Sequence, residues 1–166
     1  MARPAVPFEI AVRVFFRDRW LCSHCRRPTI FPPALKFLAA RVADELPDVP
    51  LAYWDERWRR DRAPLLDELG ASVDHVQAFA LGGAHDESNF ATICAKCNAR
   101  KGTRSREQHA AIDTPRIVKG KYGEPTAWDG LASTFVVLAR QRAQALTASE
   151  KSWLAALEAW FRAPAR

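Results

Sequence analysis

The sequence predicts an α+β fold that is mainly helical and contains a small ββα unit. Apolar residues recur at helical spacing near both ends of the 166-residue chain, and prolines or capping residues precede several of these stretches. Two short β-leaning segments, 71–77 and 89–93, are followed by a helical segment from 94 to about 109. About half of the residues are apolar, which is enough to form a buried core.

The N-terminal part of the chain contributes two predicted helices. The first is expected over 7–20, where one face carries Phe8, Val12, Phe15 and Phe16. The second opens at Pro32 and runs to about Leu46, because proline suits the first turn of a helix and Pro47 then stops it.

Residues 33–70 are interpreted as a helical insertion. Its second part, 47–70, alternates aromatic and charged residues, and we expect it to be largely irregular. Trp54 and Trp58 lie beside several arginines and are suited to stacking on bases, but tryptophans at this spacing more often belong to a core, which is the interpretation preferred here.

The C-terminal part is predicted to be a linker followed by helices. Two prolines and two glycines within 114–125 indicate the linker. Two apparent capping boxes, Thr126 with Asp129 and Thr147 with Glu150, predict helices near 127–146 and 148–162. The expected organisation is a first unit over residues 1–112, with the ββα motif at 71–109, and a C-terminal extension over 113–166 that packs on it.

All four cysteines occur in two Cys-x-x-Cys pairs at 22–25 and 94–97. Two such knuckles supply four thiolates, which form a closed tetrahedral zinc site of the structural type. The alternatives are buried free thiols or redox-active pairs, but neither pair lies near a thioredoxin-like βαβ pattern. We therefore expect Cys22, Cys25, Cys94 and Cys97 to bind structural Zn²⁺, with removal of the metal unfolding the region around it.

The charge balance suits a polyanionic partner. Lys and Arg number 25 against 19 Asp and Glu, a formal charge of +6 that falls to about +4 if four thiolates bind zinc. Residues 98–121 carry seven basic and two acidic side chains, although a solvated helix face gives the same pattern. No apolar run approaches the roughly 18 residues needed to span a bilayer, and no signal peptide is visible, so a cytoplasmic protein without a membrane partner is expected.

One ordered motif extends from residue 73 to residue 102. It runs Val73-Asp74-His75-Val76, then Gly82-Gly83, then Asn89, then Cys94-Ala-Lys-Cys97-Asn98-Ala-Arg100-Lys101-Gly102. In order and spacing it resembles the HNH endonuclease family, whose bacterial and phage members share the ββα-metal fold. The chain is the variant with Asn98, not His, at the third signature position.

The chemistry of these residues suits phosphodiester hydrolysis. Asp74 and Asn98 offer oxygen ligands to a catalytic Mg²⁺ or Mn²⁺. His75 is suited to activate water, since its ring titrates near neutral pH. By resemblance, Asn89 orients the His75 ring. The expected contacts to substrate phosphate are Arg100, Lys101 and Arg104.

Each of these residues alone has an ordinary interpretation as a cap or surface group, whereas together they predict a metal-dependent endonuclease. Its expected partner is nucleic acid, most simply DNA, and the protein is expected to be a monomer or a weak homodimer. The alternatives are a zinc-stabilised nucleic-acid-binding module without catalysis and a zinc-scaffolded protein-interaction domain. His85 and His109 are interpreted as surface residues, although the loop position of His85 would also allow it to approach substrate. His24 lies inside a knuckle whose two cysteines already suffice for the metal.

Overall fold

The computed structural model describes residues 4–48, 68–102, 104 and 128–163. Much of the predicted insertion, including Trp54 and Trp58, lies outside the described residues. So do the predicted linker, Thr126, His109 and the basic residues from 105 to 121. Among the described residues, no helix is long and apolar enough to cross a membrane.

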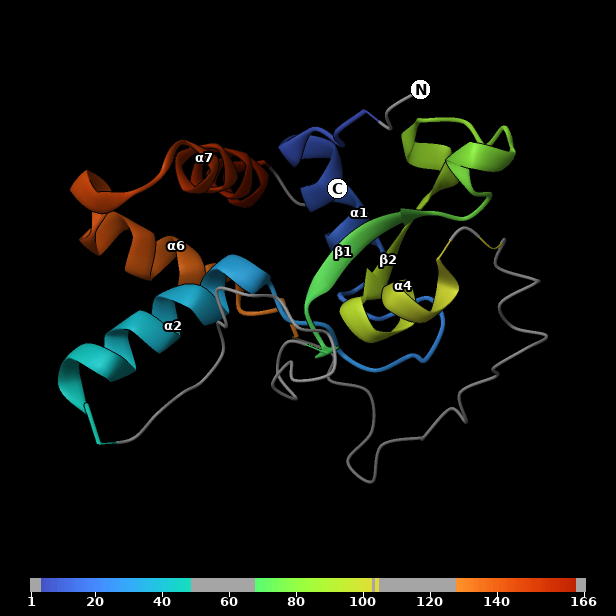
Figure 1. Ribbon diagram of the computed structural model, residues 1–166. Helices are drawn as coiled ribbons and strands as arrows, with labels where there is room; N and C mark the ends of the chain where they lie inside the picture. Colours follow the sequence, from blue (N-terminus) through green and yellow to red (C-terminus); the bar gives the residue numbers. More distant parts are fainter. Residues whose placement is uncertain (1–3, 49–67, 103, 105–127, 164–166) are drawn as a thin grey trace.

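The described elements form a helical group and a ββα unit, joined by helix α1 (Figure 1). The helical group comprises α1 (Phe8–Arg17), α2 (Pro32–Glu45), α6 (Ala132–Gln141) and α7 (Ala148–Arg162). The ββα unit comprises β1 (Ala71–His75), β2 (Phe90–Cys94) and α4 (Ala95–Lys101). Helix α1 contacts α7 on one side and both strands on the other. This mixture of helices with one small sheet confirms the predicted class in outline.

The two strands pair antiparallel, with Asp74 opposite Ala91 and His75 opposite Phe90. Side chains alternate between the faces of a sheet, so neighbours in sequence point to opposite sides. Ser72 and Asp74 face α4, whose side chains bond to both of them. The opposite face packs against α1, where the Thr92 hydroxyl donates to the Val14 carbonyl. The pleat therefore separates Asp74 from His75.

The first two helices form close to their predicted positions. Helix α1 ends at Arg17 and not at residue 20, because Arg19 and Trp20 both adopt left-handed backbone angles (φ 55°). Helix α2 begins at Pro32 as expected. The spacing of Leu35, Leu38, Val42 and Leu46 predicts one apolar face for this helix. Only Leu35 of these four is buried, and Leu46, just after the helix, is 55% exposed.

The C-terminal helices differ in how well their ends were predicted. Helix α7 carries the predicted capping box, in which Thr147 and Glu150 exchange bonds between side chain and backbone. Helix α6 is shorter than the predicted 127–146, because Gly130 and Leu131 adopt positive φ angles just before it. At Gly130 an added Cβ would lie 2.2 Å from the Trp20 ring, so this close approach requires glycine.

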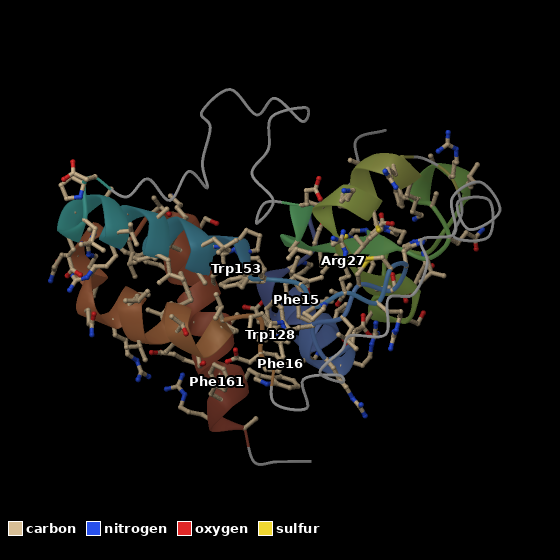
Figure 2. All side chains as sticks on the ribbon, turned by 90° about the horizontal axis from the view of Figure 1, so that it is seen from below. Phe15, Phe16, Arg27, Trp128, Trp153 and Phe161 are labelled. Carbon is tan, nitrogen blue, oxygen red and sulfur yellow. The ribbon has the colours of Figure 1, made fainter. Side chains whose placement is uncertain are left out.

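Aromatic side chains join the helices of the helical group. Phe15 of α1 stacks on Trp20 at 4.7 Å between ring centroids and on Trp153 of α7 at 6.3 Å. Figure 2 shows Phe15, Phe16, Trp153 and Phe161 gathered where α1 meets α7. Phe31 contacts Phe135 edge-on at 5.2 Å, which connects the start of α2 to α6. These contacts bury large apolar areas, so this region has a conventional hydrophobic core.

Candidate functional site

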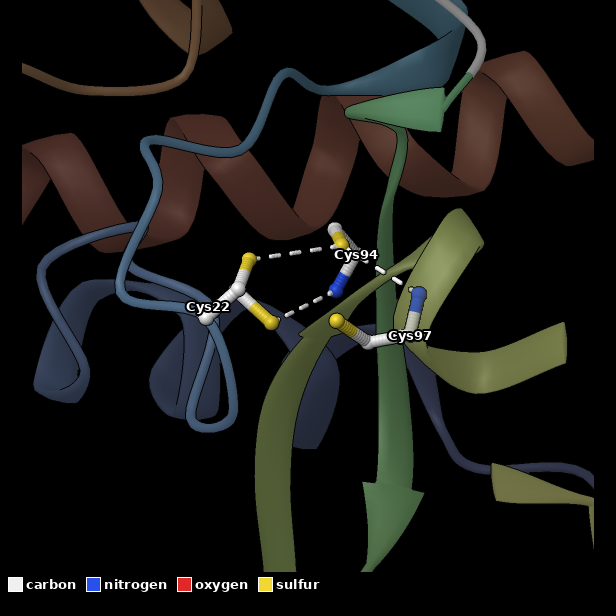
Figure 3. A group of neighbouring side chains, drawn as sticks. Cys22, Cys94 and Cys97 are labelled. Carbon is white, nitrogen blue, oxygen red and sulfur yellow. Dashed lines mark hydrogen bonds between the residues drawn. The ribbon is translucent and has the colours of Figure 1, made fainter. Parts of the chain in front are cut away.

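The four cysteines converge in the folded chain. Cys22 and Cys25 lie in the turn after α1, Cys94 ends β2, and Cys97 lies in the first turn of α4. All four are buried, and their sulfur atoms lie within 4.8 Å of one another. Figure 3 shows Cys22 facing Cys94 and Cys97 across a small gap. Zn–S bonds of about 2.3 Å imply a tetrahedral S–S edge of about 3.8 Å, and the Cys25 and Cys94 sulfurs are 3.8 Å apart. The cluster therefore fits a tetrahedral metal ion.

Backbone and side-chain donors surround these sulfurs. The Cys94 N–H donates to the Cys22 Sγ at 3.3 Å, and the Cys97 N–H donates to the Cys94 Sγ at 3.4 Å. Hydrogen bonds from the side chains of Cys22, Cys94 and Cys97 hold the pKa of Cys25 well below its usual value. The pKa of Cys97 is raised by hydrogen bonds with the same group of thiols. None of the four forms a disulfide, and four buried sulfurs within 4.8 Å of one another favour a shared metal over independent thiols.

Asp74 and His75 end strand β1 and are both buried, with 9% and 2% of their surface exposed. The Asp74 carboxylate accepts a hydrogen bond from the Lys101 ammonium, which also donates to the His75 carbonyl. Lys101 is only 1% exposed. The expectation that Lys101 contacts a substrate phosphate does not fit this position, since burial of an ammonium requires the local anion that Asp74 provides. Lys101 instead fixes Asp74 from the last turn of α4.

Asn98 lies on the same side of β1 as Asp74. Its amide nitrogen donates to the Ser72 hydroxyl at 3.4 Å, and Ser72 shares a strand face with Asp74. The residue of α4 that bonds to Asp74 is Lys101, one helical turn after Asn98. The Asn98 carbonyl oxygen and the Asp74 carboxylate thus belong to facing elements. They are hard oxygen donors of the kind that Mg²⁺ and Mn²⁺ prefer, and two of them leave most of an octahedral shell to water and substrate.

His75 meets a second histidine that the sequence analysis took for a surface residue. The His75 Nε2 lies 3.2 Å from the His85 Nδ1. Phe90 packs edge-on against both rings, with centroid distances of 4.9 Å to His75 and 5.1 Å to His85. One nitrogen of the contact must donate and the other accept, so His85 restricts the plane of the His75 ring and links the tautomers of the two rings. The signal available in the sequence was the position of His85, in a loop that leaves β1 directly after His75 and returns as β2.

Asn89 does not take the predicted role of orienting the His75 ring. Its side-chain oxygen accepts from the Gln77 N–H at 2.9 Å. Its amide nitrogen donates to the carbonyls of Gln77 and Ala84, at 3.0 and 2.8 Å, so both amide hydrogens are used. A Cβ at Gly83 would lie 2.0 Å from the Gln77 carbonyl oxygen, which explains why a glycine occupies this position in the loop that Asn89 holds. Asn89 therefore shapes the loop that presents His85 and acts on His75 only through it.

The other two predicted substrate contacts lie on the surface. Arg100 in the last turn of α4 and Arg104 beyond it are both exposed, and an Arg104 guanidinium N–H donates to the Arg100 carbonyl at 2.9 Å. They sit on the same side of the ββα unit as the end of α4 that carries Lys101. Their positions are compatible with contact to a phosphate backbone.

Comparison with known proteins identifies one segment of the chain. A family model described as HNH endonuclease matches residues 64–104, the segment that contains β1, β2 and α4. The resemblance predicted from the sequence is thereby confirmed over these residues. No curated protein and no solved structure matches the chain.

Proposed function

We propose, from the HNH endonuclease segment at residues 64–104, that the protein is a metal-dependent endonuclease that hydrolyses phosphodiester bonds, with DNA as the expected substrate. One observation carries the proposal. Asp74 and His75 occupy the end of β1 on opposite faces, the carboxylate toward α4 and the imidazole toward the loop that holds His85. This arrangement separates a group that binds a cation from a group that takes a proton.

Asp74 and Asn98 are the residues proposed to hold a catalytic Mg²⁺ or Mn²⁺. When bound, such an ion neutralises the charge that develops on the phosphorus oxygens and the leaving oxygen. Lys101 keeps the Asp74 carboxylate in place, because its ammonium is anchored to the backbone of the same strand through the His75 carbonyl.

His75 is the proposed general base. A neutral imidazole can accept the proton of a water molecule as that water attacks phosphorus. The His75 Nε2 contacts the His85 Nδ1 at 3.2 Å. A water that donates to this nitrogen must take the position of His85, so His85 is a positioning residue whose contact opens when substrate and water enter.

The four cysteines are proposed to bind structural Zn²⁺. The metal would join the turn after α1 to the end of β2 and the start of α4, and so hold Asn98 and Lys101 against β1. Residues 1–112 are proposed as the nuclease unit and 113–166 as an extension packed on it. The contacts of α7 with α1 and of α6 with α2 support that packing. One such site for each chain makes nicking the simplest activity, and two concerted cuts would need a dimer.

One observation favours a second candidate, a zinc-stabilised nucleic-acid-binding module without catalysis. Lys101 already neutralises Asp74, so the carboxylate has a resident cation without any metal. The two candidates differ in what they do to DNA, since the module binds and leaves the backbone intact.

Nicking of supercoiled plasmid DNA distinguishes the two. The zinc-loaded protein is expected to convert plasmid to the open circle with Mg²⁺ or Mn²⁺ and not with excess EDTA. The Asp74→Asn variant, purified in parallel, preserves the shape of the side chain, removes its charge and is expected to lose the activity; it also controls for contaminating nucleases. An unchanged plasmid in every metal, together with a gel shift of the same DNA, would establish the binding module instead. A duplex RNA of matched sequence tests the choice of DNA.

A further inference from the structure

A hollow of about 440 Å³ lies at the outer edge of β2, between the end of α1 and the first cysteine knuckle. We call it the arginine hollow, because its polar lining is dominated by Arg17, Arg19 and Arg26. Ser23 and Ser88 complete the polar part of its wall. None of these residues belongs to the proposed catalytic set or to the basic stretch that the sequence analysis singled out.

The hollow has a surplus of positive charge. Asp18 is the one acidic residue that lines it, and its carboxylate is already engaged by the Arg17 guanidinium at 2.9 Å and by the Thr92 N–H at 2.7 Å. Arg17 is fixed further by donating to the carbonyls of Glu87 and Phe90. Arg19 and Arg26 are exposed, and within the described part of the chain neither forms an ion pair. Two guanidinium groups therefore remain to bind an anion in a recess with a fixed wall.

Both of these arginines are held in an uncommon backbone conformation. Arg19 has φ 55° and Arg26 has φ 59°, the left-handed region in which residues with a Cβ are disfavoured. Glycine and asparagine adopt this conformation more easily, so either residue can replace both arginines without adding strain.

The arginine hollow adjoins the proposed active site through the sheet. Phe90 and Ala91 line it, and in the strand register these residues lie opposite His75 and Asp74. Adjacent strands are about 4.8 Å apart, and successive phosphates of one DNA strand advance about 3.4 Å along the helix axis. Part of the wall of the hollow is thus one strand away from Asp74 and His75, a separation comparable to the spacing of neighbouring phosphates.

We propose that the arginine hollow binds a phosphate group of the DNA backbone that flanks the phosphodiester being cleaved. Guanidinium groups suit this ligand because their planar N–H groups bind two phosphate oxygens at once. The inference rests on the proposed function and extends it: the substrate would cross the face between α4 and the first knuckle, with Arg100 and Arg104 on one side of the scissile bond and Arg19 and Arg26 on the other.

The test is the salt dependence of binding to a DNA duplex, measured by fluorescence anisotropy without added Mg²⁺ so that no cleavage occurs. The variant is Arg19→Asn with Arg26→Asn, since asparagine tolerates the left-handed conformation and removes the charge. The matched control, Lys151→Gln with Arg162→Gln, removes the same charge from exposed positions on α7. Removal of one phosphate-binding cation lowers the slope of log K against log salt concentration by about 0.9.

We expect the slope of the Asn variant to fall by about one to two and the control to keep the slope of the unmodified protein. Equal slopes for the Asn variant and the control would overturn the proposal. If the Asn variant melts early or releases zinc, Arg19→Gly with Arg26→Gly gives the same readout without backbone strain. A protein that binds DNA with the expected slopes and never cleaves it would contradict the proposed endonuclease activity and support phosphate binding in the arginine hollow. Cleavage with unchanged slopes would contradict phosphate binding in the hollow alone.

Discussion

The helical group and the ββα unit are stabilised in different ways. The helical group is held by aromatic and aliphatic packing, with Trp20, Phe31 and Phe135 almost fully buried. The ββα unit consists of two five-residue strands and a seven-residue helix, too little to form a core of its own. Four of the six buried polar or charged residues in the described part of the chain belong to it: Asp74, His75, Thr92 and Lys101. Val73 and Phe90 extend the shared apolar core into the strands, and specific polar and sulfur contacts supplement it around the reactive side chains.

Removal of the metal from the cysteine cluster should produce the largest difference in stability between the two regions. Structural zinc contributes an apparent binding free energy of about 10–16 kcal/mol, which is coupled to folding. After chelation we expect the amides of β1, β2 and α4 to exchange hydrogen rapidly, while those of α6 and α7 stay protected. Hydrogen exchange followed by mass spectrometry measures both. Equal loss of protection everywhere would mean that the regions fold as one unit, and no loss anywhere would mean that the metal is dispensable.

The buried Lys101–Asp74 pair should give the next largest effect. Lys101→Met leaves Asp74 buried without its cation, and breaking such a pair costs about 3–5 kcal/mol. Lys96→Met is the control on the same helix, because the Lys96 pair with Glu68 is partly exposed and is worth at most about 1 kcal/mol. Urea unfolding of both variants measures the difference. Added Mg²⁺ should restore more stability to Lys101→Met than to the unmodified protein if Asp74 is a metal ligand; equal costs for the two substitutions would contradict the assigned role of Lys101.

The smallest effect is expected from an ion pair of the helical group. Lys36 donates to Glu150 at 2.9 Å from a half-exposed position, so Lys36→Met should cost at most about 1 kcal/mol. Burial raises the pKa of Glu150, but hydrogen bonds from Thr147 and Lys36 outweigh it and the net pKa is lowered. Because a lowered pKa favours the folded state only while the carboxyl is ionised, this stability is present above about pH 4.3 and is lost as the pH falls further.

Lys36→Met should therefore flatten the acid limb of the stability curve and leave the neutral region nearly unchanged. Thermal melts between about pH 3 and pH 7 provide the measurement. A loss at neutral pH as large as that of Lys101→Met would remove the distinction between the two regions.

The features predicted from the sequence depend on local or strictly spaced signals. The α7 capping box is a contact between residues three apart, so Thr147 and Glu150 identify it without the fold. The convergence of the four cysteines could be predicted because each Cys-x-x-Cys pair can present two thiolates to one tetrahedral metal ion. The start of α6 could not, because it depends on the approach of Gly130 to Trp20, which lies far earlier in the chain.

The parts of the candidate site that were missed depend on where long side chains end. Lys101 was expected to contact a substrate phosphate, yet its position one turn after Asn98 directs it to Asp74 on β1. Asn89 was expected to orient the His75 ring, but His85 contacts that ring instead. The loop between the strands folds back and brings His85, not Asn89, to His75. The order of residues in the sequence identified the correct segment, residues 64–104. The role of each side chain in it depends on tertiary contacts.

The most direct test of the account is the single-turnover rate of DNA cleavage by zinc-loaded protein in excess over substrate, with saturating Mg²⁺, for the unmodified protein and His75→Ala. Excess enzyme removes differences in substrate affinity, so the rate reports the chemical step. We expect a loss of about 10²–10⁴ in this rate, as for removal of a general base. Equal rates for the two proteins would show that His75 takes no proton in the reaction and would contradict the central claim.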